Sequence, residues 1–219
     1  VSEGGHEWTN SETVTLPAGT HVEKYTYNND GTHSAVCEVC GTVIVENEVC
    51  TYDENGICTK CGSKEVSVKY KSHVQTYGDR PWVYDGESSG TENESKRMES
   101  IYIELENATA EDSIQYKAHV QGIGWQDWVE DGEMAGTQLQ SKRVEAIQIK
   151  LDGPIADKYD VYYRVHAQQF GWLDWAKNGE EAGTAGYGYR LEAFQVKLVK
   201  KGAEAPGDTE NPFEEKLIE

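Results

Sequence analysis

This sequence of 219 residues has no long apolar run, few basic residues, and no cysteines outside one short segment. It has no run of about 18 apolar residues, so no helix is expected to insert into a membrane. Lys and Arg number 20 against 39 Asp and Glu, which gives a formal net charge of -19. Nucleic acids and anionic membranes attract basic surfaces, so neither is expected as a partner. No segment shows the period of 3.6 residues that marks an amphipathic helix.

The residues that are plentiful build strands and turns. Hydrophobic residues make up 37% of the chain, alongside 22 Gly, 13 Tyr and 6 Trp. This balance is typical of a turn-rich globular protein and excludes a disordered one. The chain is long enough for one or two domains with hydrophobic cores. We therefore expect an all-β protein.

One segment occurs three times. Its copies run from Tyr70 to Leu105, from Tyr116 to Leu151 and from Tyr163 to Leu198, and the tyrosines that open them are 46 and 47 residues apart. Apolar and polar residues alternate at both ends of each copy, which predicts half-buried strands. Between them, each copy has Asp or Asn before Gly, a pair that favours a tight turn.

Three copies of a unit too small to bury its own apolar face predict threefold closure. We expect a pseudo-threefold β-prism, with a β-trefoil as the alternative. The repeats cover residues 66–105, 113–151 and 159–198, within a domain of residues 65–199. Residues 200–219 contain Pro, Gly and many acidic groups, which predicts a linker or disordered tail.

The five cysteines all lie between Cys37 and Cys61, too crowded for a general disulfide framework. Each of two Cys-x2-Cys-Gly segments has the spacing of a zinc knuckle. We predict one tetrahedral, structural Zn²⁺ site made of Cys37, Cys40, Cys58 and Cys61, in a zinc-ribbon-like module of residues 1–64. A segment this short buries little apolar surface, so it needs a cross-link such as a bound metal ion to be stable.

Two alternatives stay open for these cysteines. Local disulfides are one, although an odd count leaves a cysteine such as Cys50 unpaired. In the other, His33 and Cys50, which precede the first and second knuckles, ligate a second ion together with His21 or His6. Four thiolates would leave no open coordination position, which indicates a structural rather than a catalytic metal.

The candidate ligand-binding residues of the repeats are aromatic and hydrogen-bonding side chains. Sugars stack their C–H faces on aromatic rings and need polar partners for their hydroxyls. Trp125 and Trp172 have no counterpart in the first copy, so we expect them to be exposed platforms for a sugar ring. Trp82, Trp128 and Trp175 recur once in each copy, and side chains with that repetition could also fill a threefold core. The candidates are Trp82, Trp125, Trp128, Trp172, Trp175, Asp85, Asp131, Asn178, Gln121 and Gln168.

Other polar residues recur without a catalytic pattern. His73, His119 and His166 could meet on a threefold axis, but a local hydrogen-bond partner is the commoner arrangement for a strand histidine. Arg and Glu two residues apart in each copy, such as Arg143 and Glu145, share one strand face and are expected to form ion pairs between repeats. No catalytic triad order or phosphate-binding loop is present, so an enzyme is not expected.

The middle copy reads Tyr-x2-His-Val-Gln-x2-Gly-Trp-x2-Trp-Val-x-Asp-Gly, and this pattern resembles the clostridial hydrophobic-Trp (ChW) repeat over residues 66–199. The first copy departs from it at Asp79-Arg-Pro81, and the third at Gly186-Tyr-Gly-Tyr189. The N-terminal segment resembles the His/Cys-rich zinc-ribbon-like modules of clostridial surface proteins.

These resemblances imply an extracellular or cell-surface protein of a Gram-positive anaerobe that attaches to a glycan or another surface polymer. Many weak sites on one chain gain affinity through effective concentration. We therefore expect a non-catalytic carbohydrate-binding or adhesion module that is monomeric within a larger multidomain protein. The alternative is a structural or protein-interaction spacer without a glycan site.

Overall fold

The computed structural model describes residues 7–9, 13–15, 21–29 and 31–216. The chain divides into two compact units, Val1–Glu65 and Val66–Glu219. Regular structure is almost entirely β, as predicted, and the one helix of the described residues is the single turn α1 (Ile155–Lys158). Within the described ranges, no helix is long and apolar enough to cross a membrane.

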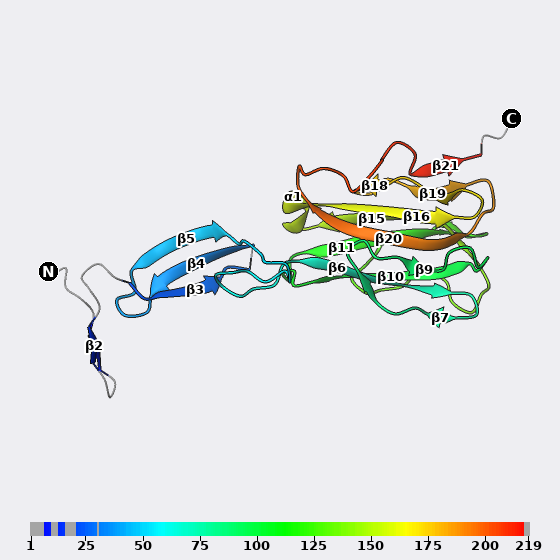
Figure 1. The fold of residues 1–219 in the computed structure, drawn as a ribbon. Helices are drawn as coiled ribbons and strands as arrows, with labels where there is room; N and C mark the ends of the chain where they lie inside the picture. The colour runs from blue at the N-terminus through cyan, green and yellow to red at the C-terminus, as the bar shows by residue number, and fades with distance from the viewer. Residues whose placement is uncertain (1–6, 10–12, 16–20, 30, 217–219) are drawn as a thin grey trace. The chain divides into compact units, whose positions relative to one another are not determined.

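The first unit is a small antiparallel β-structure (Figure 1). Three strands form one sheet in the order β3-β4-β5, and two short strands pair with each other. After the last strand, the chain returns through two isolated bridges, Tyr52 with Cys58 and Ile57 with Lys64. The strands are β1 (Glu7–Thr9), β2 (Thr13–Thr15), β3 (Glu23–Tyr27), β4 (Thr32–Cys37) and β5 (Val43–Val49).

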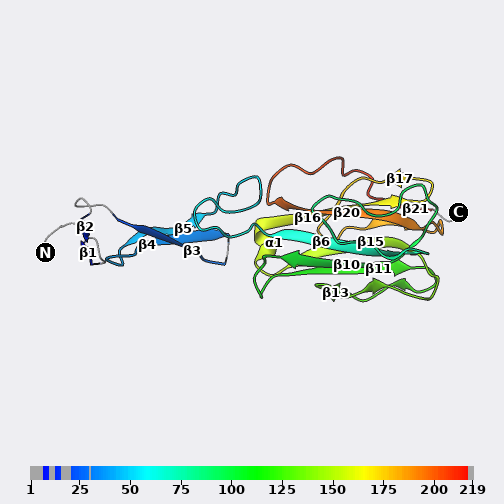
Figure 2. The same ribbon diagram turned by 60° about the horizontal axis from the view of Figure 1, so that its bottom comes forward.

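In the second unit, each repeat contributes two long strands and three short ones. The long strands run along the length of this unit (Figures 1 and 2). The first repeat has β6 (Ser67–Val74), β7 (Gly78–Asp79), β8 (Val83–Tyr84), β9 (Ser89–Gly90) and β10 (Met98–Glu106). The second has β11 (Ser113–Val120), β12 (Gly124–Trp125), β13 (Val129–Glu130), β14 (Ala135–Gly136) and β15 (Val144–Asp152). The third has β16 (Tyr159–Ala167), β17 (Gly171–Trp172), β18 (Ala176–Lys177), β19 (Ala182–Ala185) and β20 (Leu191–Lys200), and β21 (Phe213–Glu215) follows it.

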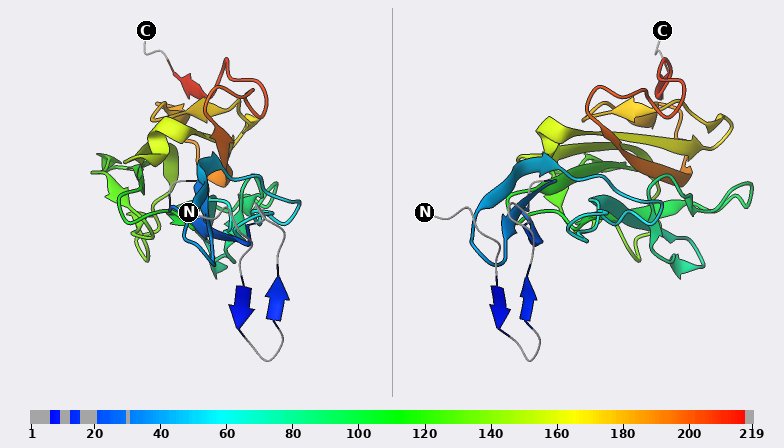
Figure 3. Two further views of the ribbon diagram at one scale, coloured as in Figure 1. Left: turned by 90° about the vertical axis from the view of Figure 1, so that its left-hand side faces the viewer. Right: turned by 60° about the vertical axis from the view of Figure 1, so that its left-hand side comes forward.

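The repeats close into a ring by exchanging one short strand each. β14 of the second repeat pairs with β10 of the first, and β19 of the third pairs with β15 of the second. β9 of the first repeat pairs with β20 of the third, which closes the ring. In the left view of Figure 3, the strands of the three repeats lie around one centre. The result is three separate sheets and no closed barrel in the described residues, so of the two predicted forms the β-prism is confirmed.

Alternating sequence places the core of this unit on one face of each long strand. In β6 and β11, every second residue is buried. The tyrosines that open the repeats, Tyr70, Tyr116 and Tyr163, are fully buried, and the ring of Tyr70 lies 5.0 Å from that of Phe194. Aromatic side chains of this size dominate the packing of a small core.

The tryptophans that recur once per repeat do not fill this core. Trp82 and Trp128 each keep 37% of their surface exposed, and only Trp175 is buried, at 6%. The prediction that these rings could fill a threefold core is therefore wrong, because the core consists of the tyrosines that open the repeats together with aliphatic side chains and Phe194. The tryptophans follow a turn, where alternation along a strand no longer decides which face a side chain takes.

Candidate functional site

The two Cys-x2-Cys-Gly segments have the same local structure. In each, the glycine N–H donates to the carbonyl of the first cysteine at 2.9 Å, and Gly41 and Gly62 have φ of 71° and 73°. Glycine adopts this left-handed conformation without a steric penalty. The turn points both thiols of a segment to one side, as a metal knuckle requires. All five cysteines are free of disulfides.

The two knuckles contribute to different clusters. His33, Cys50, Cys58 and Cys61 bring their ligand atoms within 4.8 Å of one another, and His21, Cys37 and Cys40 do the same separately. The predicted site with all four knuckle cysteines is therefore wrong. Two clusters are observed, but they differ from the predicted alternative as well, because each cluster takes one knuckle: His33 and Cys50 join the second knuckle, and His21 joins the first. The reason lies in β4, where Cys37 follows His33 by four residue steps of extended strand, a distance of about 13 Å.

The cluster around His33 is a complete set of four donors. His33 is almost fully buried, and its Nδ1 lies 3.4 Å from the Cys50 sulfur and 3.8 Å from that of Cys58. The sulfurs of Cys50 and Cys61 are 3.7 Å apart. On the other side of the imidazole, Nε2 lies 3.0 Å from a carboxylate oxygen of Glu48, a contact that fixes the ring orientation. One imidazole and three thiols can hold a metal ion and leave no open position.

The knuckle turns also favour thiolates. Burial opposes ionisation of Cys58, but two backbone N–H groups of its own turn outweigh it and lower the pKa of the thiol to about 6. Burial opposes ionisation of Cys37 too, and a backbone N–H group and the His21 side chain bring its pKa to about 6. Burial and the neighbouring thiol of Cys58 raise the pKa of Cys50 to about 12. Thiolate is the metal-binding form of cysteine, so each knuckle supplies one ready ligand.

The second cluster is more exposed. The sulfur of Cys40 lies 3.5 Å from Nδ1 of His21 and 3.1 Å from the hydroxyl of Thr42. The described residues supply three donors here, His21, Cys37 and Cys40. His6, the other histidine considered as a ligand, lies outside the described residues. Three donors with this chemistry fit the same kind of ion as the buried cluster.

In the second unit, the outer face of the second repeat carries a row of aromatic and cationic side chains. Trp125 meets His119 edge-on, with ring centroids 5.4 Å apart. The ammonium of Lys117 lies 4.9 Å from the ring centroids of both Trp125 and Trp128. The ammonium of Lys150, on the neighbouring long strand, lies 4.6 Å from the Trp128 ring. These cation–π contacts hold the exposed indole of Trp128 and the partly exposed indole of Trp125 in place, and we call this row the tryptophan face.

The first repeat has a reduced form of this row. Asp79 stands where the second repeat has Trp125, and it bonds to the ammonium of Lys71 at 2.7 Å. These charge-assisted bonds, from Lys71 first and then from His73, lower the pKa of Asp79. Lys71 also lies 5.3 Å from the ring of Trp82. The first repeat therefore offers one exposed indole beside an ion pair that is already satisfied.

In the third repeat, the residues that follow β20 cover one ring of the row, Trp175, and leave Trp172 partly exposed. Arg164 lies 4.8 Å from the rings of both Trp172 and Trp175. The N–H of Trp175 donates to the carbonyl of Asp208 at 2.8 Å, and a Cβ added to Gly207 would lie 3.1 Å from the indole nitrogen. The backbone of the tail thus passes directly over this ring and buries it.

The tail also adds a strand to a sheet. β21 pairs in parallel with β19, and the N–H of Asn211 donates to the Asp174 carboxylate at 2.9 Å. The structure thus differs from the prediction of a linker or disordered segment, because residues 203–216 lie on the third repeat. We call these residues the strap.

The turn residues proposed as sugar partners are used inside the fold. Oδ1 of Asp131 accepts the N–H of Ile114 at 3.4 Å, and Oδ1 of Asn178 accepts that of Val161 at 2.9 Å. Asp85 occupies the matching place in the first repeat. These side chains fix the start of a long strand, so their acceptor oxygens already serve backbone N–H groups of the fold. Gln121 and Gln168 are half-buried at the turns that follow β11 and β16, and their side chains make no hydrogen bond among the described residues.

The histidines and the arginine–glutamate pairs belong to single repeats. Arg143 Nη2 lies 2.7 Å from Oε1 of Glu145, and His119 Nδ1 lies 3.2 Å from Oε2 of the same carboxylate. The third repeat has the same cluster around Glu192. The expected ion pairs are present, but they join residues of one repeat rather than two. The histidines have local acidic partners, which favours the structural interpretation.

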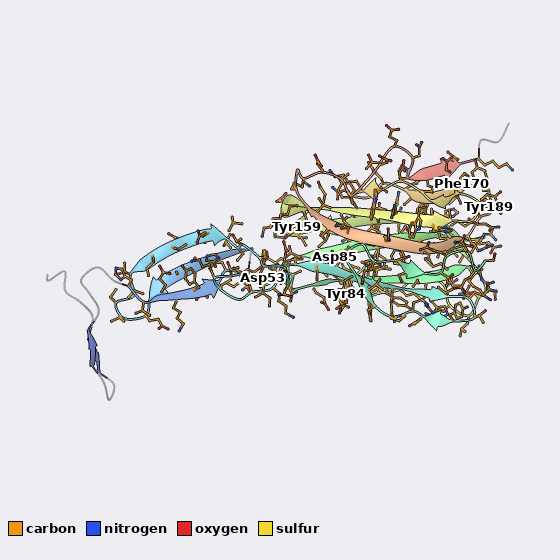
Figure 4. The ribbon with its side chains drawn as sticks, viewed as in Figure 1. Asp53, Tyr84, Asp85, Tyr159, Phe170 and Tyr189 are labelled. Carbon is orange, nitrogen blue, oxygen red and sulfur yellow. The ribbon has the colours of Figure 1, made fainter. Side chains whose placement is uncertain are left out.

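One aromatic cluster was not among the predicted site residues. The rings of Tyr187 and Tyr189 stack at 5.4 Å, and Phe170 meets Tyr187 edge-on at 5.3 Å. Phe170 and Tyr189 lie at one end of the long strands, whereas Tyr84 and Asp85 lie toward the other end (Figure 4). The departure of the third copy at its Gly-Tyr-Gly-Tyr loop was the signal that could have found this cluster.

Comparison with known families agrees with this arrangement. The family model described as "Clostridial hydrophobic W" (ChW) matches residues 73–107, 119–153 and 166–200, one match in each repeat. No curated protein and no solved structure matches the chain. The chain thus carries three clostridial hydrophobic W repeats, closed into one β-prism that follows a His/Cys-rich module in the sequence.

Proposed function

We propose that this chain is a non-catalytic carbohydrate-binding module that attaches a larger extracellular or cell-surface protein of a Gram-positive anaerobe to glycans. The observation that carries the proposal is the exposure of Trp128 beside the partly exposed Trp125 on one face. Large apolar rings are normally buried, and the core here is filled by tyrosines, so packing does not account for their position. Paired indoles on a flat sheet face suit the C–H face of a sugar ring.

Polar groups around the tryptophan face are suited to sugar hydroxyls. Gln148 lies on the neighbouring strand, directly opposite Lys117 in the register. Its side-chain amide donates to Glu181 at a long 3.4 Å, a bond that a ligand hydroxyl can replace. The side chain of Gln121 lies at the end of the strand that carries Lys117. These groups replace the turn residues as partners for the sugar.

For the first unit, we propose structural Zn²⁺ at His33, Cys50, Cys58 and Cys61. Three thiols and one imidazole are the donor set that tetrahedral structural zinc takes, and Glu48 orients the imidazole from behind. When bound, the ion supplies a cross-link that a module of this size lacks in its core. A four-donor site leaves no position for substrate, which supports a role without catalysis.

The test is binding of the whole chain, as a monomer, to insoluble polysaccharides and to a glycan array. We expect binding to at least one glycan, and a loss of about tenfold or more in the Trp125→Ala/Trp128→Ala variant, because stacking on a ring contributes about 1 kcal/mol. Trp175→Phe is the matched control, since the strap covers that indole, and its binding should not change.

Two results would contradict the proposal. Absence of binding to any glycan, with folding confirmed, would exclude the carbohydrate class. Glycan binding that persists unchanged in the double alanine variant would exclude the tryptophan face as the site. With either result, a structural or protein-interaction spacer becomes the better explanation, and the closed ring of repeats is the observation that favours it.

A further inference from the structure

The tryptophan face holds two cations without an acidic partner, in a chain whose net charge is -19. The contacts of Lys117 are the rings of Trp125 and Trp128, and that of Lys150 is the ring of Trp128. Among the residues that the structure describes, no carboxylate forms an ion pair with either ammonium group. Both side chains are half-buried, so they lie along the sheet rather than extending into solvent.

The other two repeats give the cation at the position of Lys117 a polar partner. In the first repeat, the ammonium of Lys71 bonds to Asp79 at 2.7 Å. In the third, Arg164 bonds to Gln195 at 2.6 Å and is attracted by the Glu92 carboxylate. The second repeat lacks such a partner, so its charge is available to a ligand.

Three acids lie near this surface, and one of them, Glu145, is already paired with His119 and Arg143. A carboxylate oxygen of Glu130 accepts from Gln115 at 3.5 Å, and one of Glu181 accepts from Gln148 at 3.4 Å. Each thus interacts with a neutral amide rather than with a lysine. The remaining acids of the chain act over longer distances, and at physiological salt the screening length is about 8 Å. Groups in contact with a ligand therefore outweigh the remote negative charge.

The two lysines are placed for one ligand group. In the register of β11 and β15, Gln115 lies opposite Lys150 and Lys117 lies opposite Gln148. Lys117 and Lys150 are therefore diagonal neighbours, a spacing of about 7–8 Å. An anionic group between them can accept hydrogen bonds from both ammonium groups, and such charge-assisted bonds are stronger than neutral ones.

We propose that the tryptophan face of the second repeat binds an anionic sugar polymer, with a carboxylate or phosphate between Lys117 and Lys150 and a sugar face against the indoles. This inference rests on the proposed function, since it names the class of glycan that the same site takes. Only the second repeat is expected to prefer anionic over neutral sugars, because the matching cations of the first and third repeats already have partners in the fold.

The experiment compares three probes on the whole chain by calorimetry or immobilised-ligand binding. Polygalacturonate tests the carboxylate, a phosphomannan tests the phosphate, and fully methyl-esterified polygalacturonate is the neutral partner of the first. At a low salt concentration of about 0.05–0.15 M, we expect at least one anionic probe to bind about tenfold more tightly than the neutral probe. This preference should shrink when the salt concentration is raised about threefold to tenfold, to about 0.5 M, because salt screens the charges.

The decisive variant is Lys117→Gln/Lys150→Gln, and Lys142→Gln/Lys197→Gln is the control with the same change in charge. We expect the first to lose the anionic preference while it keeps binding to the neutral polymer, and the control to retain the preference. Equal binding of anionic and neutral probes by the unaltered chain overturns this inference and leaves the proposed function standing. Equal loss in both double variants also overturns it, because net charge would then explain the effect. Binding to no polysaccharide of any charge overturns both.

Discussion

At the scale of single residues, three glycines make ring closure possible. Gly90, Gly136 and Gly183 lie in the short strands that pair with another repeat, and all have positive φ. A Cβ at Gly136 would lie 2.4 Å from the carbonyl oxygen of Glu99, and the other two glycines meet equivalent carbonyls. Only glycine lets the two backbones approach this closely.

We expect Gly136→Ala to destabilise the repeat domain by about 3 kcal/mol, because backbone strain and a clash with a neighbouring carbonyl add together. Gly122→Ala is the control. Its φ of 69° is also left-handed, but nothing lies within 4 Å of the added carbon, so the cost should be only about 1 kcal/mol. Urea unfolding measures both, and equal losses in the two variants would mean that close approach is unimportant.

The buried tyrosines predict sensitivity to alkali. Burial raises the pKa of Tyr70, Tyr116 and Tyr163 well above 10.0, the value expected in an unfolded chain. The folded state therefore keeps these protons at pH values where the unfolded state releases them. Their contribution to stability is full below about pH 10 and decreases as pH rises above it.

We expect the urea midpoint to fall steeply between about pH 10 and 11.5, and Tyr116→Phe to reduce that slope by removing one of the three protons. Tyr84→Phe, a change at an exposed ring, should leave the slope unaltered. A slope that is the same in all three proteins would show that other groups cause the alkaline loss.

Alternation along the strands was enough to predict that the face with Val68 and Tyr70 is buried. It could not sort the aromatic rings after the turns, because Trp82 and Trp128 recur with the same regularity as core residues. Their exposure follows from the core, which the tyrosines, Phe194 and aliphatic side chains of all three repeats already form. Packing of the whole ring decides this, and a single repeat does not contain that information.

At the scale of elements, the strap of the third repeat makes a backbone hydrogen bond that the side chain of Gln126 makes in the second repeat. In the second repeat, the Gln126 amide accepts the N–H of Gly136 at 2.6 Å and donates to its carbonyl at 3.1 Å. The third repeat has Leu173 at that place, and there the N–H of Gly183 donates to the carbonyl of Pro212 at 3.0 Å. An apolar residue thus leaves an open strand edge for the strap.

We expect deletion of residues 203–219 to expose Trp175, because the strap backbone covers its indole. Acrylamide should then quench a larger fraction of the tryptophan fluorescence. The increase should disappear when the deletion is combined with Trp175→Phe, which is its control. Unchanged quenching after deletion would mean that the strap does not cover the ring in solution.

The strap could not have been predicted from its own residues. Pro, Gly and acidic residues favour a linker, and β21 pairs through only three residues. Its docking depends on an edge left unsatisfied by Leu173 more than thirty residues earlier. Local propensity has no information about such an edge, whereas the long strands of the repeats carry their own pattern.

At the scale of the whole molecule, each unit is stabilised differently. The β-prism has a continuous core of residues from all three repeats. The described residues of the first unit include few large buried apolar side chains, and they gather five cysteines and two histidines into two clusters. Knuckle spacing predicted that metal ligands are present, but it fits one shared site as well as two. The extended run of β4 decides between them, since it separates His33 from Cys37.

We expect protein purified without added zinc to contain about two equivalents of the metal, one in each cluster, because separate donor sets bind separately. Cys58→Ser/Cys61→Ser and Cys37→Ser/Cys40→Ser should each retain about one equivalent, measured by elemental analysis. In a single site shared by all four cysteines, either pair of changes would remove all the metal. A strong chelator should then unfold the first unit and leave the melting of the β-prism unchanged, because the core of the prism has no metal ligand among its members. Loss of all zinc in both variants would show that the four cysteines share one site.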